Sequence, residues 1–160
     1  MAREYLGIML LNSIQHFSLE IALEAKAKRA LLVGVNKYND RKISNLNFCV
    51  NDVTSVHRIL TSPERGGFDP NSCYLMVDDS KEDRFKPIRS NLMSSIKSLS
   101  KIAKSDDYLL FFFSGHGMEE NGKSYLLPAD ASARVSYLRI VNERVLLRSI
   151  LWVIQRRNGQ

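Results

Sequence analysis

A histidine flanked by two glycines follows the most apolar run of the chain. Residues 107–113 read Asp-Tyr-Leu-Leu-Phe-Phe-Phe, and Ser-Gly-His-Gly follows them at 114–117. Glycines on both sides allow the backbone to turn sharply and to approach a ligand closely. Imidazole exchanges protons near neutral pH, so His116 is a candidate general acid or base. At this point a loop histidine that only satisfies a turn is the alternative.

A second pattern fits the glycine-rich loops that hold phosphates. Residues 117–124 read Gly-Met-Glu-Glu-Asn-Gly-Lys-Ser, which is a glycine, four residues and then Gly-Lys-Ser. Such a loop must open a helix, yet Pro128 follows closely, and two glutamates would lie beside the phosphates. We therefore favour a β-hairpin over residues 118–127 with Asn-Gly at its turn, and keep nucleotide binding as an alternative.

The segments that must position this histidine alternate along the chain between short apolar runs and longer stretches with apolar residues at helical spacing. The runs at 30–35, 73–77 and 107–113 lack polar alternation, which is typical of strands buried on both faces. Apolar residues recur at helical spacing over 52–60 and over 87–104. This order predicts an α/β fold with a mainly parallel central sheet and helices on both faces. Ligands of such sheets bind beyond the carboxyl ends of the strands, which indicates the loop after Val35 and the turn at His116.

The length and composition of the chain are those of a single globular domain. The 160 residues are 44% hydrophobic and 25% charged, which excludes disordered and multidomain classes. The net charge of +6 is concentrated in residues 131–160, which hold six arginines and one glutamate. Residues 28–130 show no basic cluster interleaved with aromatics, so we expect no nucleic-acid partner.

The two ends of the chain differ from the alternating segment. Residues 1–27 are expected to form an amphipathic helix or extension, and residues 131–160 a basic, apolar helical tail. No apolar run reaches the roughly 20 residues that a membrane span needs. We recognise no convincing export signal, so a cytoplasmic location with free thiols at Cys49 and Cys73 is expected.

Four segments of the chain carry a common pattern in their order and spacing: Lys28–Tyr38, Leu46–Val53, Phe111–Gly117 and Tyr125–Asp130. Together they resemble the caspase-like cysteine peptidases and the metacaspase branch in particular. The resemblance covers residues 28–130 and implies a three-layer α/β sandwich that is incomplete on its C-terminal side. It also implies cysteine-type endopeptidase activity on protein or peptide substrates.

The resemblance assigns roles to five residues. His116 corresponds to the catalytic histidine, and the amide of Gly117 to the donor that holds the oxyanion. Asp52 corresponds to the acid that lines the pocket for the residue before the cut, with Cys49 and Ser114 beside it. A carboxylate there would pair with Arg or Lys of the substrate. The position of Asp52 also fits a helix N-cap, and both roles are compatible.

The chain departs from the family pattern at the position of the nucleophile. In the family the catalytic cysteine lies about 50 residues after the histidine, but no cysteine follows His116 here. Neither Cys49 nor Cys73 is assigned that role, so we expect the chain to be inactive alone and truncated before its cysteine. The alternative is a pseudo-enzyme that binds a partner at the exposed sheet edge, where a missing C-terminal segment would otherwise pack.

Many metacaspases respond to calcium, which the resemblance makes possible here, and no other cofactor is expected. The acidic residues after the histidine do not allow a metal site to be assigned. They are Glu119, Glu120, Asp130 and Glu143.

Overall fold

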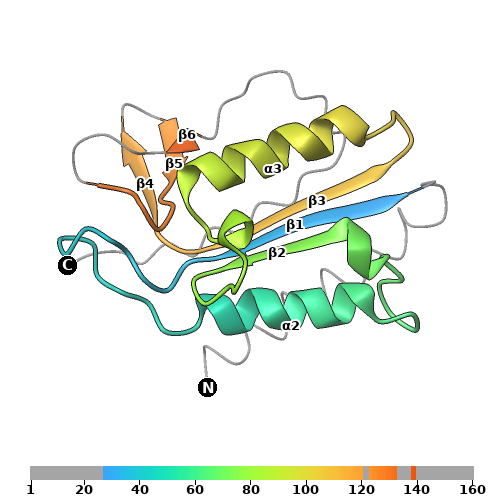
Figure 1. Ribbon diagram of the computed structural model, residues 1–160, viewed down its shortest axis with the longest axis horizontal. Helices are drawn as coiled ribbons and strands as arrows, with labels where there is room; N and C mark the ends of the chain where they lie inside the picture. Colours follow the sequence, from blue (N-terminus) through green and yellow to red (C-terminus); the bar gives the residue numbers. More distant parts are fainter. Residues whose placement is uncertain (1–26, 121–122, 133–137, 140–160) are drawn as a thin grey trace.

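The computed structural model describes residues 27–120, 123–132 and 138–139. A parallel sheet with strand order β2-β1-β3 lies between helices α2 and α3, as Figure 1 shows. The expected α/β architecture, with a mainly parallel sheet and a helix on each face, is confirmed. The bounds are β1 Lys28–Gly34, α2 Cys49–Thr61, β2 Cys73–Val77, α3 Arg89–Ile102 and β3 Tyr108–Ser114.

Alternate residues of each strand face opposite helices, because successive side chains of a strand point to opposite faces. In β1, Leu31 and Val33 pack in the core under α3, whereas Ala30 and Leu32 pack in the core under α2. All four are at most 1% exposed. Both faces of the sheet are therefore buried, which explains why the strands show no polar alternation in the sequence.

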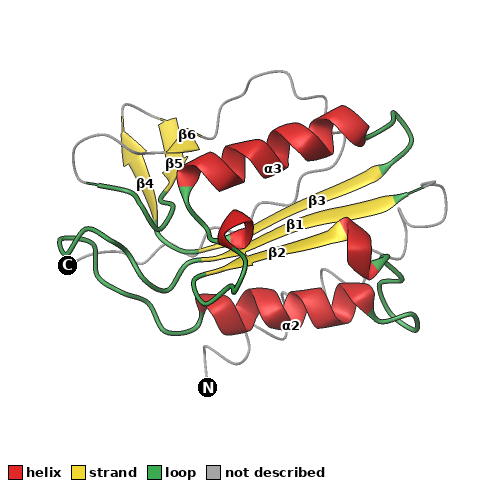
Figure 2. Ribbon diagram, viewed as in Figure 1, coloured by secondary structure: helices red, strands yellow, loops and turns green. Residues whose placement is uncertain are grey.

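A second, antiparallel sheet follows β3 at one end of the molecule (Figure 2). In it, β4 and β5 pair antiparallel, with Glu120 opposite Lys123, so the predicted hairpin is confirmed. Lys123 opens a strand rather than a helix, so the phosphate-loop alternative is wrong: no helix N-terminus follows the glycines. The strands are β4 Gly117–Glu120, β5 Lys123–Leu126 and β6 Leu138–Arg139.

The predicted helical tail contains one strand. Leu138 and Arg139 form β6 and pair with Leu126 and Tyr125, which gives the second edge of β5 a hydrogen-bonding partner. The tail is thus not helical throughout. The helix predicted over residues 1–27 falls outside the described residues, apart from residue 27, which is not helical, and so does the tail beyond residue 139.

Helix α2 begins three residues earlier than the sequence predicts. Its first residue is Cys49, and its N-cap residue Phe48 makes no side-chain capping bond. Instead Asn36, which follows β1, accepts the Cys49 N–H through its side-chain oxygen at 2.9 Å. A helix end needs such acceptors for its free N–H groups. The N-cap interpretation of Asp52 is therefore wrong, because Asp52 lies inside the first turn.

Helix α3 is anchored in the same way. The side chain of Asp130, which follows β5, accepts the Arg89 N–H at 2.8 Å. Pro87 lies before the helix rather than in its first turn, and its carbonyl accepts the Ala129 N–H at 2.9 Å. Two short 3-10 helices, η1 Pro70–Ser72 and η2 Asp83–Phe85, complete the described elements.

Candidate active site

The carboxyl ends of β1 and β3 meet the N-terminus of α2. The Val35 N–H donates to the Ser114 carbonyl at 2.9 Å, which holds the two strand ends together. Gly34 makes the close approach of the helix possible: a Cβ there would lie 2.7 Å from Val53 Cγ2 and 2.8 Å from the Cys49 carbonyl oxygen. The strand alternation turns Ser114 toward α2, the same face as Leu110 and Phe112.

Ser114, Asp52 and Cys49, which the resemblance placed around one pocket, lie together. Ser114 Oγ donates to Asp52 Oδ2 at 3.0 Å and also hydrogen bonds the Cys49 thiol. Ser114 is 4% exposed and is the one buried polar residue of the described chain. A buried hydroxyl must find partners, and these two side chains of α2 supply them.

Asp52 has a carboxylate oxygen that a ligand can reach. Its Oδ2 accepts the Ser114 hydrogen bond, while no described residue donates to Oδ1, which is not among the buried, unpartnered oxygens. Of the lysines and arginines that the structure describes, none forms an ion pair with it. Burial raises the pKa of Asp52, and the Ser114 hydrogen bond partly offsets this rise. A cation that joined it would remove this cost of burial.

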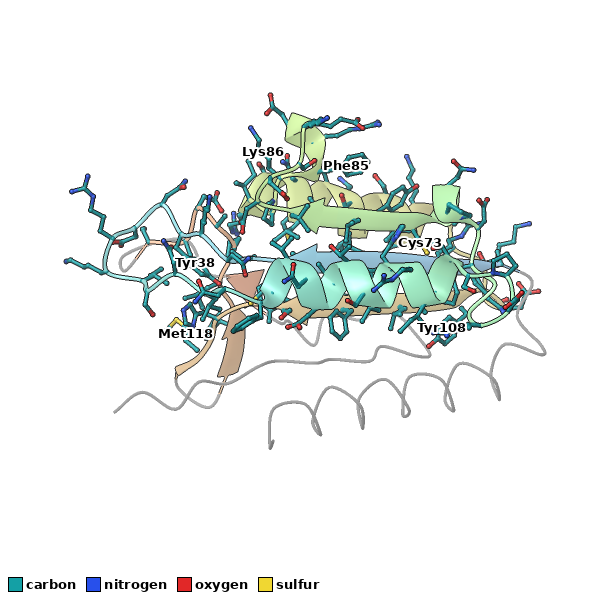
Figure 3. The ribbon with its side chains drawn as sticks, turned by 90° about the horizontal axis from the view of Figure 1, so that it is seen from below. Tyr38, Cys73, Phe85, Lys86, Tyr108 and Met118 are labelled. Carbon is teal, nitrogen blue, oxygen red and sulfur yellow. The ribbon has the colours of Figure 1, made fainter. Side chains whose placement is uncertain are left out.

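His116 is held by the loop that follows β1. Its backbone N–H donates to the Tyr38 hydroxyl at 2.8 Å, and the two rings lie 5.1 Å apart between centroids. Figure 3 shows Tyr38 at this end of the sheet, beside Met118 of β4. Burial raises the pKa of Tyr38 well above its ordinary value, so Tyr38 stays a neutral hydroxyl. His116 itself is partly exposed.

The imidazole has a defined hydrogen-bonding direction. His116 Nε2 lies 2.8 Å from the Ser44 carbonyl oxygen. Because a carbonyl only accepts, Nε2 carries the proton and Nδ1 of the neutral ring has a free lone pair. The ring can then take a proton at Nδ1 while the carbonyl stabilises the imidazolium, as a general base requires.

The amide of Gly117 is not used by the hairpin. Leu127 N–H donates to the His116 carbonyl at 3.0 Å, which makes these two residues a hydrogen-bonded position of the ladder. The next pair, Gly117 with Leu126, is then a non-hydrogen-bonded pair, and its N–H groups point away from the partner strand. This N–H is therefore available as a donor next to His116.

Sequence reasoning missed the residues that hold the loop in position. Asp78 Oδ2 accepts the Asn36 and Lys37 N–H groups at 2.6 and 3.1 Å, and burial raises the pKa of Asp78. Asp78 directly follows β2, so the rule that loops after parallel strands carry sites would have found it. Tyr38 and Ser44 carry no such signal, because their partner lies far along the chain.

Neither described cysteine is suited to be the nucleophile. Cys49 and Cys73 are free and buried. Burial raises the pKa of Cys49, and it raises the pKa of Cys73 to about 12. A thiolate, rather than a thiol, attacks carbonyls, so both side chains are unreactive at neutral pH. Cys73 also lies at the amino end of β2, at the other end of the sheet from Tyr38 in Figure 3.

Two findings bear on metals and membranes. In residues 27–120, 123–132 and 138–139, no group of three or more His, Cys, Asp or Glu side chains is arranged to hold a metal ion. Asp130 caps α3 instead. Among the described helices, none is long and apolar enough to cross a membrane.

This combination is a parallel α/β sheet whose carboxyl end carries His116, the Gly117 N–H and the Asp52 carboxylate, the arrangement that the resemblance to caspase-like peptidases implies. Residues 28–134 match the family described as metacaspase, peptidase C14 domain. The match covers more than half of the chain, so the chain belongs to the metacaspase family.

Curated relatives agree with this family. The chain is 36% identical over 93 residues to metacaspase-1 of Yarrowia lipolytica, covering 58% of this chain and 19% of that protein. It is 30% identical over 99 residues to metacaspase-1 of Plasmodium falciparum, covering 62% of this chain and 16% of that protein. The chain thus spans less than a fifth of the length of these relatives.

Proposed function

We propose that this chain forms the histidine-bearing part of a cysteine endopeptidase that cleaves after arginine or lysine. The observation that carries the proposal is the His116 ring, whose Nε2 faces the Ser44 carbonyl and whose Nδ1 has no hydrogen-bond partner among the described residues. The 160 residues hold two cysteines, neither of which is a suitable nucleophile. The thiolate is therefore supplied by polypeptide outside these residues.

In this proposal each step uses one group of the site. His116 Nδ1 removes the thiol proton, and the thiolate attacks the scissile carbonyl. The Gly117 N–H donates to the oxygen as it gains negative charge. His116 then returns the proton to the leaving amine, and water hydrolyses the thioester with His116 as base.

The preference for a basic residue rests on Asp52. Its carboxylate is half-buried, hydrogen bonded on one oxygen and open on the other. A guanidinium or ammonium group at Oδ1 would form a charge-assisted hydrogen bond and offset the burial of the carboxylate. A neutral or acidic side chain would leave that carboxylate uncompensated, which disfavours it in the pocket.

The edge of the sheet provides the place for a cysteine-bearing strand. β3 pairs with β1 from Tyr108 to Ser114, and none of the described strands pairs with its other edge. A strand added beside β3 would end next to Ser114, close to His116. Strands add to a sheet through backbone hydrogen bonds, so a strand with the right register could extend the sheet on this side.

A chimera tests the proposal. Residues 1–134 would be joined to the polypeptide that follows the matching segment in metacaspase-1 of Yarrowia lipolytica. We expect thiol-dependent hydrolysis of a fluorogenic arginine peptide by the chimera and none by the 160-residue chain. His116→Ala in the chimera should lower the rate at least about a hundredfold. Cys73→Ala, at the far end of the sheet, should leave the rate nearly unchanged, and Cys49→Ala should still give thiol-dependent turnover.

Two results would contradict the proposal. Thiol-dependent turnover by the 160-residue chain itself, lost in His116→Ala, would refute the need for a further cysteine. A folded chimera that binds arginine peptides without cleaving them would favour the non-catalytic, partner-binding alternative.

A further inference from the structure

Phe48 is a large apolar side chain exposed beside the acidic pocket. It is 60% exposed, compared with 47% for Met93 and Ile102, the other exposed large hydrophobic residues of the described chain. A single exposed apolar residue is common and needs no explanation by itself. Its position does call for one, because Phe48 is the N-cap residue of α2 and directly precedes Cys49.

Phe48 and Asp52 lie on the same side of α2. The Asp52 N–H donates to the Phe48 carbonyl at 2.8 Å, which closes the first helical turn. Phe48 has φ −119° and ψ −11°, in the right-handed region, so the turn at this residue is close to helical. Residues four apart on a helix have neighbouring side chains. Phe48 therefore lies one turn before Asp52 on this side of the helix, and its side chain is exposed.

An aromatic ring next to a half-open carboxylate suits a planar cation. A guanidinium can place its edge against Asp52 Oδ1 and its face on the Phe48 ring at the same time. An ammonium is also attracted to a ring face, as Lys28 Nζ is at 5.9 Å from the Phe68 ring centroid, but it is a compact, strongly hydrated charge that cannot lie flat on the ring. The same surface chemistry occurs elsewhere in this chain, where the Arg84 guanidinium lies 4.6 Å from the Phe85 ring centroid.

We propose that Phe48 is a specificity-determining residue that makes the pocket prefer arginine to lysine. The proposal rests on the proposed function, which places a basic side chain at Asp52, and goes further by separating the two basic residues. The aromatic contact favours the guanidinium, while the carboxylate attracts both cations.

Ligand titrations of the full 160-residue chain test this without catalysis. The ligands are acetyl-arginine amide, acetyl-lysine amide and acetyl-citrulline amide, the last being a neutral isostere of arginine. Binding is followed by the amide shifts of Cys49, Asp52 and Ser114 in NMR spectra of the ¹⁵N-labelled chain. The wild-type chain is expected to bind arginine most tightly, lysine more weakly and citrulline least.

Two variants of Phe48 separate its aromatic face from its apolar bulk. Phe48→Leu should weaken arginine binding by about two- to fivefold and leave lysine binding nearly unchanged. Phe48→Tyr keeps the ring and should keep the preference. Met93→Ala, an exposed apolar residue on α3, is the matched control and should change neither affinity.

The outcomes distinguish this proposal from the proposed function. An unchanged ratio of arginine to lysine affinity in Phe48→Leu overturns the role of Phe48 while the basic preference stands. Equal binding of arginine and citrulline, unaffected by Asp52→Asn, overturns the basic preference itself. A wild-type chain that binds none of the three ligands overturns both.

Discussion

At the scale of single residues, the Asp52 carboxylate lowers the folding stability when it is charged and also offers an oxygen to a cationic ligand. Its carboxylate is half-buried, and Ser114 is the one described side chain that compensates it. Burial raises the native pKa of Asp52 above its unfolded value of about 3.9. The free-energy contribution of this group to folding is thus most favourable below pH 4 and is lost as pH rises through the native pKa.

Replacing this carboxylate should stabilise the fold and weaken the binding of basic ligands at Asp52. Asp52→Asn keeps an oxygen for Ser114 and removes the buried charge, so we expect the melting temperature at pH 7 to rise by about 2 to 4 °C. The difference from wild type should shrink toward pH 4, where the wild-type carboxyl becomes neutral. Thermal unfolding followed by circular dichroism over this pH range measures it.

Asp83 provides the control for this prediction. Its carboxylate is exposed and pairs with Lys86, which lowers its pKa. Asp83→Asn should therefore bring no gain in stability at pH 7. A wild-type melting temperature at pH 7 that exceeds that of Asp52→Asn would contradict the conclusion that Ser114 only partly compensates the burial of the Asp52 carboxylate.

At the scale of elements, the site depends on how closely α2 approaches the end of β1. Gly34 allows this approach, because a Cβ would overlap Val53 and the Cys49 carbonyl. Asn36 then fixes the start of the helix through the Cys49 N–H. The two contacts place Asp52 against Ser114, so the pocket is a product of helix–sheet packing.

Gly34→Ala should push α2 away from the sheet. We expect the free energy of unfolding to fall by about 2 to 3 kcal/mol, because a packed interface must open. Binding of acetyl-arginine amide should weaken together with it. Urea denaturation and the NMR titration described above measure the two effects.

Gly67 is the matched glycine for this experiment. Its φ is +61°, but a Cβ there would meet no atom closer than 3.7 Å. Gly67→Ala should lower the free energy of unfolding by only about 1 kcal/mol and leave ligand binding unchanged. Equal losses of stability and of ligand binding in Gly34→Ala and Gly67→Ala would show that the close packing of α2 on β1 does not determine either property.

At the scale of the whole molecule, two hydrophobic cores share one sheet. Leu92 of α3, 0% exposed, belongs to the core on one face, and Cys73, 6% exposed, belongs to the core on the other. β1 contributes alternate residues to both, so neither core can persist without the strand that the other also needs. We therefore expect the described domain to unfold in one cooperative step.

Leu92→Ala tests this cooperativity. The cavity should lower the free energy of unfolding by about 3 kcal/mol, whereas Met93→Ala, at an exposed neighbouring position, should lower it by less than about 0.5 kcal/mol. Alkylation of Cys73 should become rapid at the same urea concentration at which the circular dichroism signal is lost. Protection of Cys73 beyond that concentration would mean that the two faces unfold separately.

The sequence by itself determined the elements of this protein. Uninterrupted apolar runs predicted the strands because a strand buried on both faces needs no polar side chains. The Asn-Gly turn predicted the hairpin, and the position of His116 after such a run predicted the end of the sheet at which the site lies. These features depend on neighbouring residues, so they can be found without the fold.

Only the tertiary structure decided which side chains meet. Asp52 and Ser114 are 62 residues apart, and Tyr38 and His116 are 78 apart. The resemblance placed Asp52 and Ser114 in one pocket, but the partners of His116 and the early start of α2 had no sequence signal. The physical reason is that a polar group bonds to whatever donor or acceptor packing brings within reach, and that choice depends on the strand order and the helix approach rather than on local sequence.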